Sequence, residues 1–236
     1  TYGNTRNTVW VGESQVGHQA SRHTHLAGYQ VWWEHVDDNA PAYDRTYGGT
    51  FENHGAYFQD EWRPSEKLTL IGGARFDKSN RVDHAIISPR AGIRFGLTNN
   101  WVLRASVSTG FRAPAVFDED LHIAQVGGEG FVLQNSDDLK EERSISFTGG
   151  ADYAGLLFGQ RVQFGVNLFH TQLKDAFTLD EVTVPGHEFR QLVRVNGVGA
   201  RVGGASVDGT WRLNSRFAWR GGFTSQFARW DEPESQ

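Results

Sequence analysis

Hydrophobic and polar residues alternate along most of this chain, which is the pattern of β-strands. In the segment WVLRASVSTGF, Trp101, Leu103 and Ala105 fall on one face, while Arg104 and Ser106 fall on the other. Side chains at i and i+2 share a face of a strand, so each such segment has one apolar face and one polar face. The alternation predicts ten strands, near residues 5–16, 24–36, 54–63, 68–79, 86–97, 101–111, 144–154, 161–174, 192–213 and 216–229.

The connections between the predicted strands are sorted by length. Short turns read GHQASRH, RPSEK, LTNN, AGLLFGQ and NS, and the long connections span residues 37–53, 112–143 and 175–191. Short turns at one end and long loops at the other are typical of an outer-membrane β-barrel, whose apolar faces contact lipid. A soluble β-sandwich turns its apolar faces inward and has no reason to sort its loops in this way. We therefore predict an all-β, antiparallel transmembrane β-barrel.

Aromatic residues gather beside the short turns, where a membrane barrel carries its interfacial girdle. These residues are Trp62, Trp101, Phe158, Trp211 and Phe217. In a soluble protein the same residues would cap a core. Within the predicted strand 192–213, Gly203 and Gly204 interrupt the alternation, so we expect a β-bulge at that point.

The amino-acid composition excludes several classes of protein. The chain has 236 residues, of which 38% are apolar, and no stretch approaches the roughly 18 apolar residues that a spanning helix needs. A net charge of −5 gives no footprint for nucleic acid, and the absence of cysteine excludes disulfides and thiolate metal sites. The chain begins at Thr1, contains no methionine and ends in a hydrophilic stretch. We therefore expect it to be a segment of a larger protein.

Two motifs resemble those of TonB-dependent outer-membrane receptors. In that family an FRAP-type box ends a strand, a long extracellular loop follows, and an NP-x-L-x-x-E box begins the next strand. Here STGFRAPAVFDED at residues 108–120 is followed by NSDDLKEER at 135–143, with Ser136 where proline is usual. The segment AYFQDEWRPSEKLTLIGGARFD is similar to the family's unit of strand, periplasmic turn and strand, and the likeness covers most of residues 50–229.

The resemblance implies a barrel of about 22 strands in the bacterial outer membrane, plugged by an N-terminal domain that carries the TonB box. Residues 1–236 would then be a partial barrel domain of about ten strands, with the plug and the last strands outside it. The implied partners are TonB, outer-membrane lipid and lipopolysaccharide, and a metal chelate or other small-molecule ligand. A ferric siderophore is the leading ligand, with cobalamin and haem as alternatives. Residues 112–143 would form a long extracellular loop of the kind that presents binding groups.

Basic residues on the polar faces are predicted to line the lumen of the barrel. They are Arg75, Arg90, Arg94, Arg104, Arg194 and Arg220. Two interpretations are open: the arginines guide an anionic ligand such as a ferric siderophore, or they pair with carboxylates of the plug. The second is the more ordinary use of a lumen arginine.

The long loop supplies a second set of candidates, Arg112, Asp118, Glu119, Asp120 and His122. No cofactor is required, but Asp118, Glu119 and Asp120, with Asp137 and Asp138 farther on, can supply carboxylate oxygens to Ca²⁺. His122 lies between the two boxes, where haem receptors of the family carry an axial histidine. The alternative to the calcium site is a set of solvated loop charges, and the alternative to the haem ligand is an ordinary loop histidine.

Other functions have weaker support in the sequence. His23 and His25 flank a short turn, but their two-residue spacing is a weak metal signal and the sequence offers no third ligand nearby. A membrane hydrolase would have to use Ser79 with His84, and no G-x-S-x-G, P-loop or HExxH motif occurs. We therefore expect no enzyme. A smaller, self-contained barrel that serves binding or adhesion remains the alternative, and it would pair strand 5–16 with strand 216–229.

Overall fold

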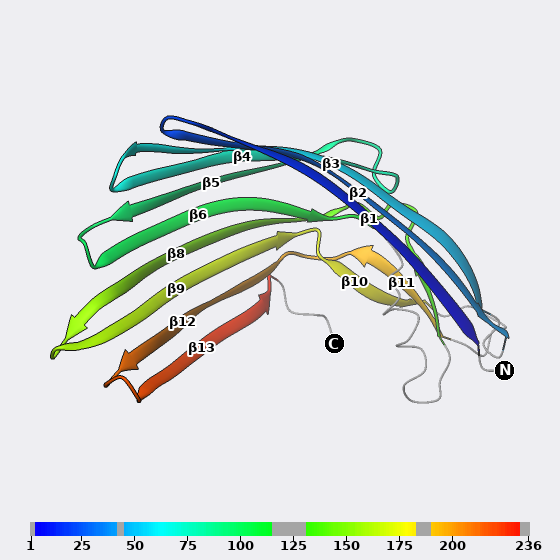
Figure 1. Cartoon of the computed structure of the whole chain (residues 1–236). Helices are drawn as coiled ribbons and strands as arrows, with labels where there is room; N and C mark the ends of the chain where they lie inside the picture. The colour runs from blue at the N-terminus through cyan, green and yellow to red at the C-terminus, as the bar shows by residue number, and fades with distance from the viewer. Residues whose placement is uncertain (1–2, 42–44, 115–130, 183–189, 232–236) are drawn as a thin grey trace.

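Ten antiparallel strands form one continuous, strongly curved sheet, the wall of the molecule (Figure 1). The computed structural model describes residues 3–41, 45–114, 131–182 and 190–231. The strand order is β1-β2-β3-β4-β5-β6-β8-β9-β12-β13, so each wall strand lies beside the next wall strand along the chain.

The wall strands are long, and most exceed the roughly 10 residues that a tilted membrane strand needs. Their bounds are β1 Asn4–Ala20, β2 His23–Ala40, β3 Arg45–Ser65, β4 Leu68–Ser79, β5 Ile86–Gly96, β6 Trp101–Arg112, β8 Glu142–Leu157, β9 Gln160–Lys174, β12 Ala200–Arg212 and β13 Ala218–Trp230. No helix in the described residues is long and apolar enough to cross a membrane.

The hairpin turns lie together at one end of the wall, the short-turn end, and the longer connections lie at the other, the long-loop end (Figure 1). The turn between β8 and β9 has only two residues, Phe158 and Gly159, and both have positive φ, 53° and 77°. Two such residues match the twist of the flanking strands. The predicted sorting therefore holds for the connections from β6 to β8 and from β9 to β12, which are long, whereas the connection from β2 to β3 has only four residues.

The register gives the wall one apolar face and one polar face. Val107 of β6 lies opposite Ala91 of β5 on one side and Phe147 of β8 on the other, so the apolar rows align across strands. Leu103, Phe147 and Phe223 remain 38%, 49% and 72% exposed. Large apolar side chains that stay exposed along a whole face contradict the β-sandwich, which would bury them, and they fit contact with lipid.

Two predicted features of the wall were wrong. The predicted long loop 37–53 is mostly strand. β2 and β3 pair without interruption, from the His23–Trp62 pair at one end to the Ala40–Arg45 pair at the other. The predicted bulge at Gly203 and Gly204 is absent, since β12 pairs in an unbroken register with both neighbours. A Cβ on Gly204 would collide with the carbonyl oxygen of Ser225, so this glycine serves a close backbone approach.

A register shift does occur elsewhere in the wall. It falls between Trp62 and Ser65 in β3, where that strand pairs with β4 at the short-turn end. Bulges are frequent at the rims of barrels, because they bend the strand as its pairing ends.

A second, three-stranded sheet lies at the long-loop end, in the order β10-β11-β7. Its strands are β7 Phe131–Asn135, β10 Phe177–Val182 and β11 Arg190–Asn196. The predicted single strand 192–213 is therefore two strands in different sheets, separated at residues 197–199. β7 and β11 are parallel because each runs back toward the wall, into β8 and β12 respectively. We call β7, β10 and β11 the rim sheet.

The outer strands of the wall, β1 and β13, each pair with one neighbour only among the described residues. The pairing of strand 5–16 with strand 216–229, which the alternative of a self-contained barrel requires, is thus not found among the described residues. Unpaired backbone groups cost several kcal/mol each in lipid. The two edges of this sheet therefore need further strands as partners in a membrane.

The faces of β6 provide a test of which side meets lipid. Val107 lies near the middle of β6 on the apolar face, and Ser106 lies beside it on the polar face. An arginine at the bilayer midplane destabilises a membrane barrel by roughly 2–4 kcal/mol. We expect Val107→Arg to lower the free energy of unfolding in lipid vesicles by this amount, measured by urea titration. Ser106→Arg is the control and should cost about 1 kcal/mol, the worth of its hydrogen bond to Thr148. Equal effects of the two variants would contradict the assignment of faces.

Candidate functional site

Four of the six arginines predicted to line the lumen, Arg75, Arg90, Arg94 and Arg104, lie on the polar face of three neighbouring strands, β4, β5 and β6. Arg94 lies directly opposite Arg104, Arg90 lies opposite Ser108, and Arg75 lies opposite Ser88. Facing residues of paired strands project to the same side of the sheet, so all four share that face. The register therefore gathers them on one surface, which we call the arginine face.

Two of these arginines are neutralised by carboxylates within the wall. The Arg75 Nε donates to both carboxylate oxygens of Asp77 at 2.9 Å, and its guanidinium also donates to the Gln30 Oε1 at 2.9 Å. The Arg104 Nε lies 2.7 Å from the Asp152 Oδ2. Asp77 is almost fully buried, and its charge is matched by this pair, so Arg75 has a structural role.

Arg90 and Arg94 differ, because no described residue makes a hydrogen bond or ion pair with either side chain. Arg90 lines a hollow of about 600 Å³, together with Arg75, Tyr57 and Glu13. Arg94 lines a second hollow of about 550 Å³ at the short-turn end, beside Arg22 and Arg63. These two guanidinium groups remain available to an anion or to carboxylates outside the described wall.

At the rim, two cations flank one aromatic ring. The guanidinium carbons of Arg112 and Arg194 each lie 5.8 Å from the centre of the Phe177 ring, which is within cation–π range. Arg194 is buried in β11 of the rim sheet, so its predicted place on the lumen face of the wall was wrong. Arg112 ends β6, where the long excursion begins.

The second sequence box is fixed to the rim sheet by one asparagine. The Asn196 Oδ1 accepts from the Lys140 N–H at 2.7 Å, and its Nδ2 donates to the carbonyls of Lys140 and Asp175 at 3.0 and 2.9 Å. The Ser136 N–H donates to the Arg194 carbonyl at 2.9 Å. Ser136, which stands where proline is usual, therefore supplies a backbone donor that proline lacks.

A charged cluster closes the connection between β6 and β8. The Arg143 guanidinium donates to the Glu141 Oε1 at 2.6 Å, and the His84 Nε2 lies 3.1 Å from the same oxygen. Burial would raise the pKa of the Glu141 carboxyl, but hydrogen bonds from Arg143 and the backbone, with the charges of Arg143 and His84, hold its pKa below the usual range.

The serine and histidine considered for hydrolysis do not form a catalytic pair. The Ser79 Oγ accepts from the Arg81 N–H at 3.1 Å and is buried, whereas His84 contacts Glu141 and Arg143. A nucleophile needs a base within hydrogen-bond reach, so this arrangement gives no support to a hydrolase.

Four of the five loop candidates, Asp118, Glu119, Asp120 and His122, lie outside the described residues. The calcium and haem predictions that depend on them stay predictions. Asp137 and Asp138 are described and exposed at the start of the second box.

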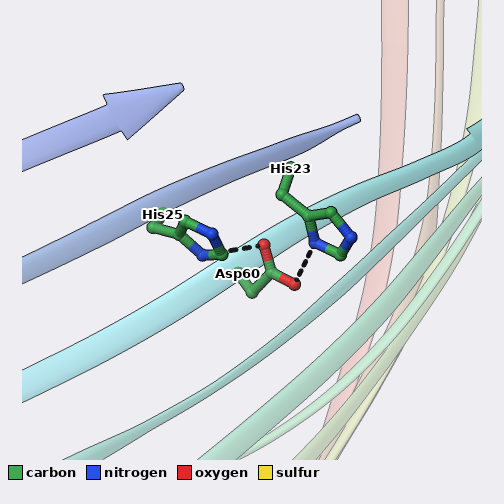
Figure 2. Close-up of side chains that lie close together, drawn as sticks. All are labelled: His23, His25 and Asp60. Carbon is green, nitrogen blue, oxygen red and sulfur yellow. Dashed lines mark hydrogen bonds and ion pairs between the residues drawn. The ribbon is translucent and has the colours of Figure 1, made fainter. Parts of the chain in front are cut away.

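The sequence missed one cluster of possible metal ligands. His23 and His25 do have a third potential ligand nearby, the carboxylate of Asp60, and the three side chains converge at the short-turn end (Figure 2). Asp60 lies 35 residues beyond His25, so only the register of β2 on β3, which places it directly opposite His25, brings it there. No periodicity in the sequence could have signalled this contact.

Comparison with known proteins decides the family. The chain matches the family model described as "TonB dependent receptor-like, beta-barrel" over residues 1–235. The chain belongs to this TonB-dependent receptor family. It is therefore a receptor barrel of the bacterial outer membrane.

Relatives of the receptor include the iron-regulated outer membrane virulence protein of two Vibrio cholerae serotype O1 strains. The identities are 33% and 32% over 123 residues, and the match covers 52% of this chain and 18% of each relative. The chain thus aligns with less than a fifth of the length of these proteins.

Solved structures share the fold of the receptor wall at low sequence identity. The siderophore receptor PirA from Pseudomonas aeruginosa has a TM-score of 0.73 at 18% identity, covering 97% of this chain and 44% of that protein. The copper transporter OprC has a TM-score of 0.73 at 14% identity, covering 96% of this chain and 39% of that protein. The FrpB iron transporter from Neisseria meningitidis has a TM-score of 0.71 at 18% identity, covering 96% of this chain and 36% of that protein.

The Glu141 cluster makes the rim of the receptor sensitive to acid. Because the folded-state pKa of Glu141 lies below its ordinary value of 4.5, its stabilisation is present above pH 4.5 and is lost as pH falls through the folded pKa. We expect hydrogen-exchange protection of residues 135–142 to decline in that acidic range, after correction for intrinsic exchange rates. In Glu141→Gln the decline should disappear. A wild-type profile that matches the variant would contradict this account of the rim.

Proposed function

We propose that this receptor imports an anionic ferric chelate, with a ferric siderophore as the leading ligand. The observation that carries the proposal is the pair of guanidinium groups on the polar face, Arg90 and Arg94, that have no hydrogen-bond or ion-pair partner in the described wall. Arginine suits this task because its planar fork binds oxyanions bidentately and stays charged at every physiological pH. Iron regulation in the name of the Vibrio cholerae relatives supports an iron-bearing ligand.

The route begins at the rim and ends at the short-turn end. The excursion after Arg112 and the rim sheet would present binding groups to the outside, and Arg90 and Arg94 would then offer positive charge along the lumen. Positive charge that no carboxylate of the wall neutralises concentrates an anionic ligand. Movement of the plug by TonB would supply the energy, and no bond of the ligand is made or broken.

Cobalamin and haem are the alternative ligands, and they differ in whether uptake should depend on His122 and on iron. Haem uptake would require His122 as an iron ligand, so it would be lost in His122→Ala. Cobalamin uptake would proceed without iron. Calcium held by Asp118, Glu119 and Asp120 is part of the proposal for the loops, and chelation of calcium during the uptake assay tests it.

The test uses a strain that lacks its other iron receptors and expresses the full-length protein in low-iron medium. Catecholate and hydroxamate siderophores, haem and cobalamin are supplied one at a time, and uptake of the labelled ligand is measured. We expect Arg90→Ala with Arg94→Ala to lower uptake of the anionic ferric ligand by about tenfold, because the steering charge is removed. Arg104→Ala is the matched control, since Asp152 already neutralises Arg104.

A second measurement separates ligand steering from pairing with the plug. If Arg90 and Arg94 hold plug carboxylates, their removal lowers the thermal stability of the purified receptor while the salt dependence of ligand binding stays that of the wild type. If they attract the ligand, stability is retained and the salt dependence of binding weakens. Full uptake of every anionic ligand by the double variant would refute the proposal.

A further inference from the structure

We propose that His23, His25 and Asp60 form a binding site for a divalent first-row transition cation, with Zn²⁺ as the reference ion. Two imidazole nitrogens and one carboxylate oxygen are a ligand set that suits Zn²⁺, Cu²⁺ and Ni²⁺. The site lies on the outer surface of the wall, so the inference is independent of the imported ligand.

The register of β2 and β3 assembles the three ligands. His23 begins β2 directly after the turn at Ser21 and Arg22, and His25 follows on the same face. Asp60 of β3 lies directly opposite His25, and its side chain points between the two imidazole rings (Figure 2). The ligands therefore come from two adjacent strands, whose backbone hydrogen bonds fix their positions.

The distances place all three ligands within reach of one cation. The His23 Nδ1 lies 2.8 Å from the Asp60 Oδ2, and the His25 Nδ1 lies 3.2 Å from the Asp60 Oδ1. One ligand atom from each residue can be chosen so that all three lie within 4.8 Å of one another. Metal–ligand bonds of about 2.0–2.2 Å in a tetrahedral site place ligand atoms a little more than 3 Å apart. A cation would thus draw the ligand atoms together from a separation of at most 4.8 Å.

Two atoms of the cluster lack a satisfactory partner. The His25 Nδ1 and the Asp60 Oδ1 face one another, are shielded from solvent, and make no hydrogen bond. Buried polar atoms are nearly always satisfied, and those that are not call for an explanation such as a missing ion. A shared cation would accept a lone pair from both atoms at once.

Stacked rings hold the imidazoles in orientation. The His23 ring lies between the rings of His25 and Trp62, at centroid distances of 5.6 and 5.9 Å and nearly parallel to both. His25 stacks in turn on His18 of β1, at 6.4 Å. Ligands whose rotamers are fixed by packing bind a metal with a smaller loss of side-chain entropy.

The surroundings favour a cation over an unpaired carboxylate. Asp60 shares its face with Phe58 and Trp62, which is the apolar, lipid-directed face of the wall, at the short-turn end. A carboxylate on that face is costly unless it is paired. The imidazoles and Asp60 remain 30–40% exposed, so an ion can enter, and water can occupy its fourth position.

His54, another histidine of the wall, shows an ordinary histidine–carboxylate pair with no third ligand. The His54 Nε2 lies 2.7 Å from the Glu52 Oε1, and the His54 Nδ1 bonds the Tyr29 hydroxyl at 2.6 Å. His54 is thus fully satisfied by two partners, on the same two strands as the cluster. The variant His54→Ala is therefore a matched control.

The experiment uses the full-length receptor, purified in detergent without a polyhistidine tag and stripped with EDTA. Zn²⁺ is titrated by calorimetry, and Co²⁺ substitution is followed by its visible absorption, which reports tetrahedral coordination. We expect one site whose affinity falls at least about tenfold in His25→Ala and in Asp60→Asn, while His54→Ala matches the wild type. Heat-modifiable gel migration establishes that each variant is folded, and His23→Gln replaces any variant that is not.

The same ion should fasten β2 to β3 at the short-turn end. Because the ligands lie on both strands, saturating Zn²⁺ should slow exchange of the backbone amides around His23, His25 and Asp60 in the wild type and in His54→Ala, but not in His25→Ala or Asp60→Asn. The proposal is overturned if the folded His25→Ala and Asp60→Asn variants bind Zn²⁺ as tightly as the wild type. It is equally overturned if His54→Ala loses as much affinity as they do.

Discussion

The pairing of every backbone N–H and C=O within the lipid-spanning part of the chain is the constraint on which this structure depends. A lipid environment offers no alternative partner, so each wall strand must pair with a neighbour on both sides along its whole membrane length. Pairing fixes the register, and the register fixes the face of every side chain, because a slip of one residue would reverse all of them. The unbroken pairing of β12 with both β9 and β13 shows how strictly this holds. The chemistry of the wall is therefore decided by whether a residue is at an odd or even position in its strand.

This rule places two kinds of chemistry on opposite sides of the same sheet. Arg90 and Arg94 fall on the polar face, where their charges are solvated and can meet an anion. His23, His25 and Asp60 fall on the apolar face, where charge must be paired or shared with an ion. The two proposed sites, for an anion on the polar face and for a cation on the apolar face, therefore lie on opposite sides of one sheet. In each case the ladder of backbone hydrogen bonds supplies the rigidity that holds the side chains in place.

The sequence predicted most clearly what alternation alone determines. The strand 68–79 was predicted with the bounds that the structure has, because Leu68, Leu70 and Phe76 fall on one face and Thr69, Arg75 and Asp77 on the other. The loop predicted at 37–53 was wrong, because strands that project beyond the bilayer carry polar residues on both faces and read as loops. The strand predicted at 192–213 combined two strands, because the residues on both sides of Gly197–Gly199 are equally strand-like. Asp60 was missed as a ligand because a sequence shows spacing within a strand, whereas the register between strands is a property of the folded sheet.

The rim sheet connects excursions that the sequence treats as separate. β7 belongs to the connection between β6 and β8, whereas β10 and β11 belong to the connection between β9 and β12. Pairing of β11 with β7, the bonds of Asn196 to Lys140 and Asp175, and the stacking of Arg112 and Arg194 on Phe177 join the two. A contact made by a ligand with one excursion is therefore supported by the backbone of the other. If the rim binds the ligand as proposed, the pair of excursions acts as one unit, and substitutions in β10 or β11 belong in a search for specificity residues alongside those between Arg112 and Arg143.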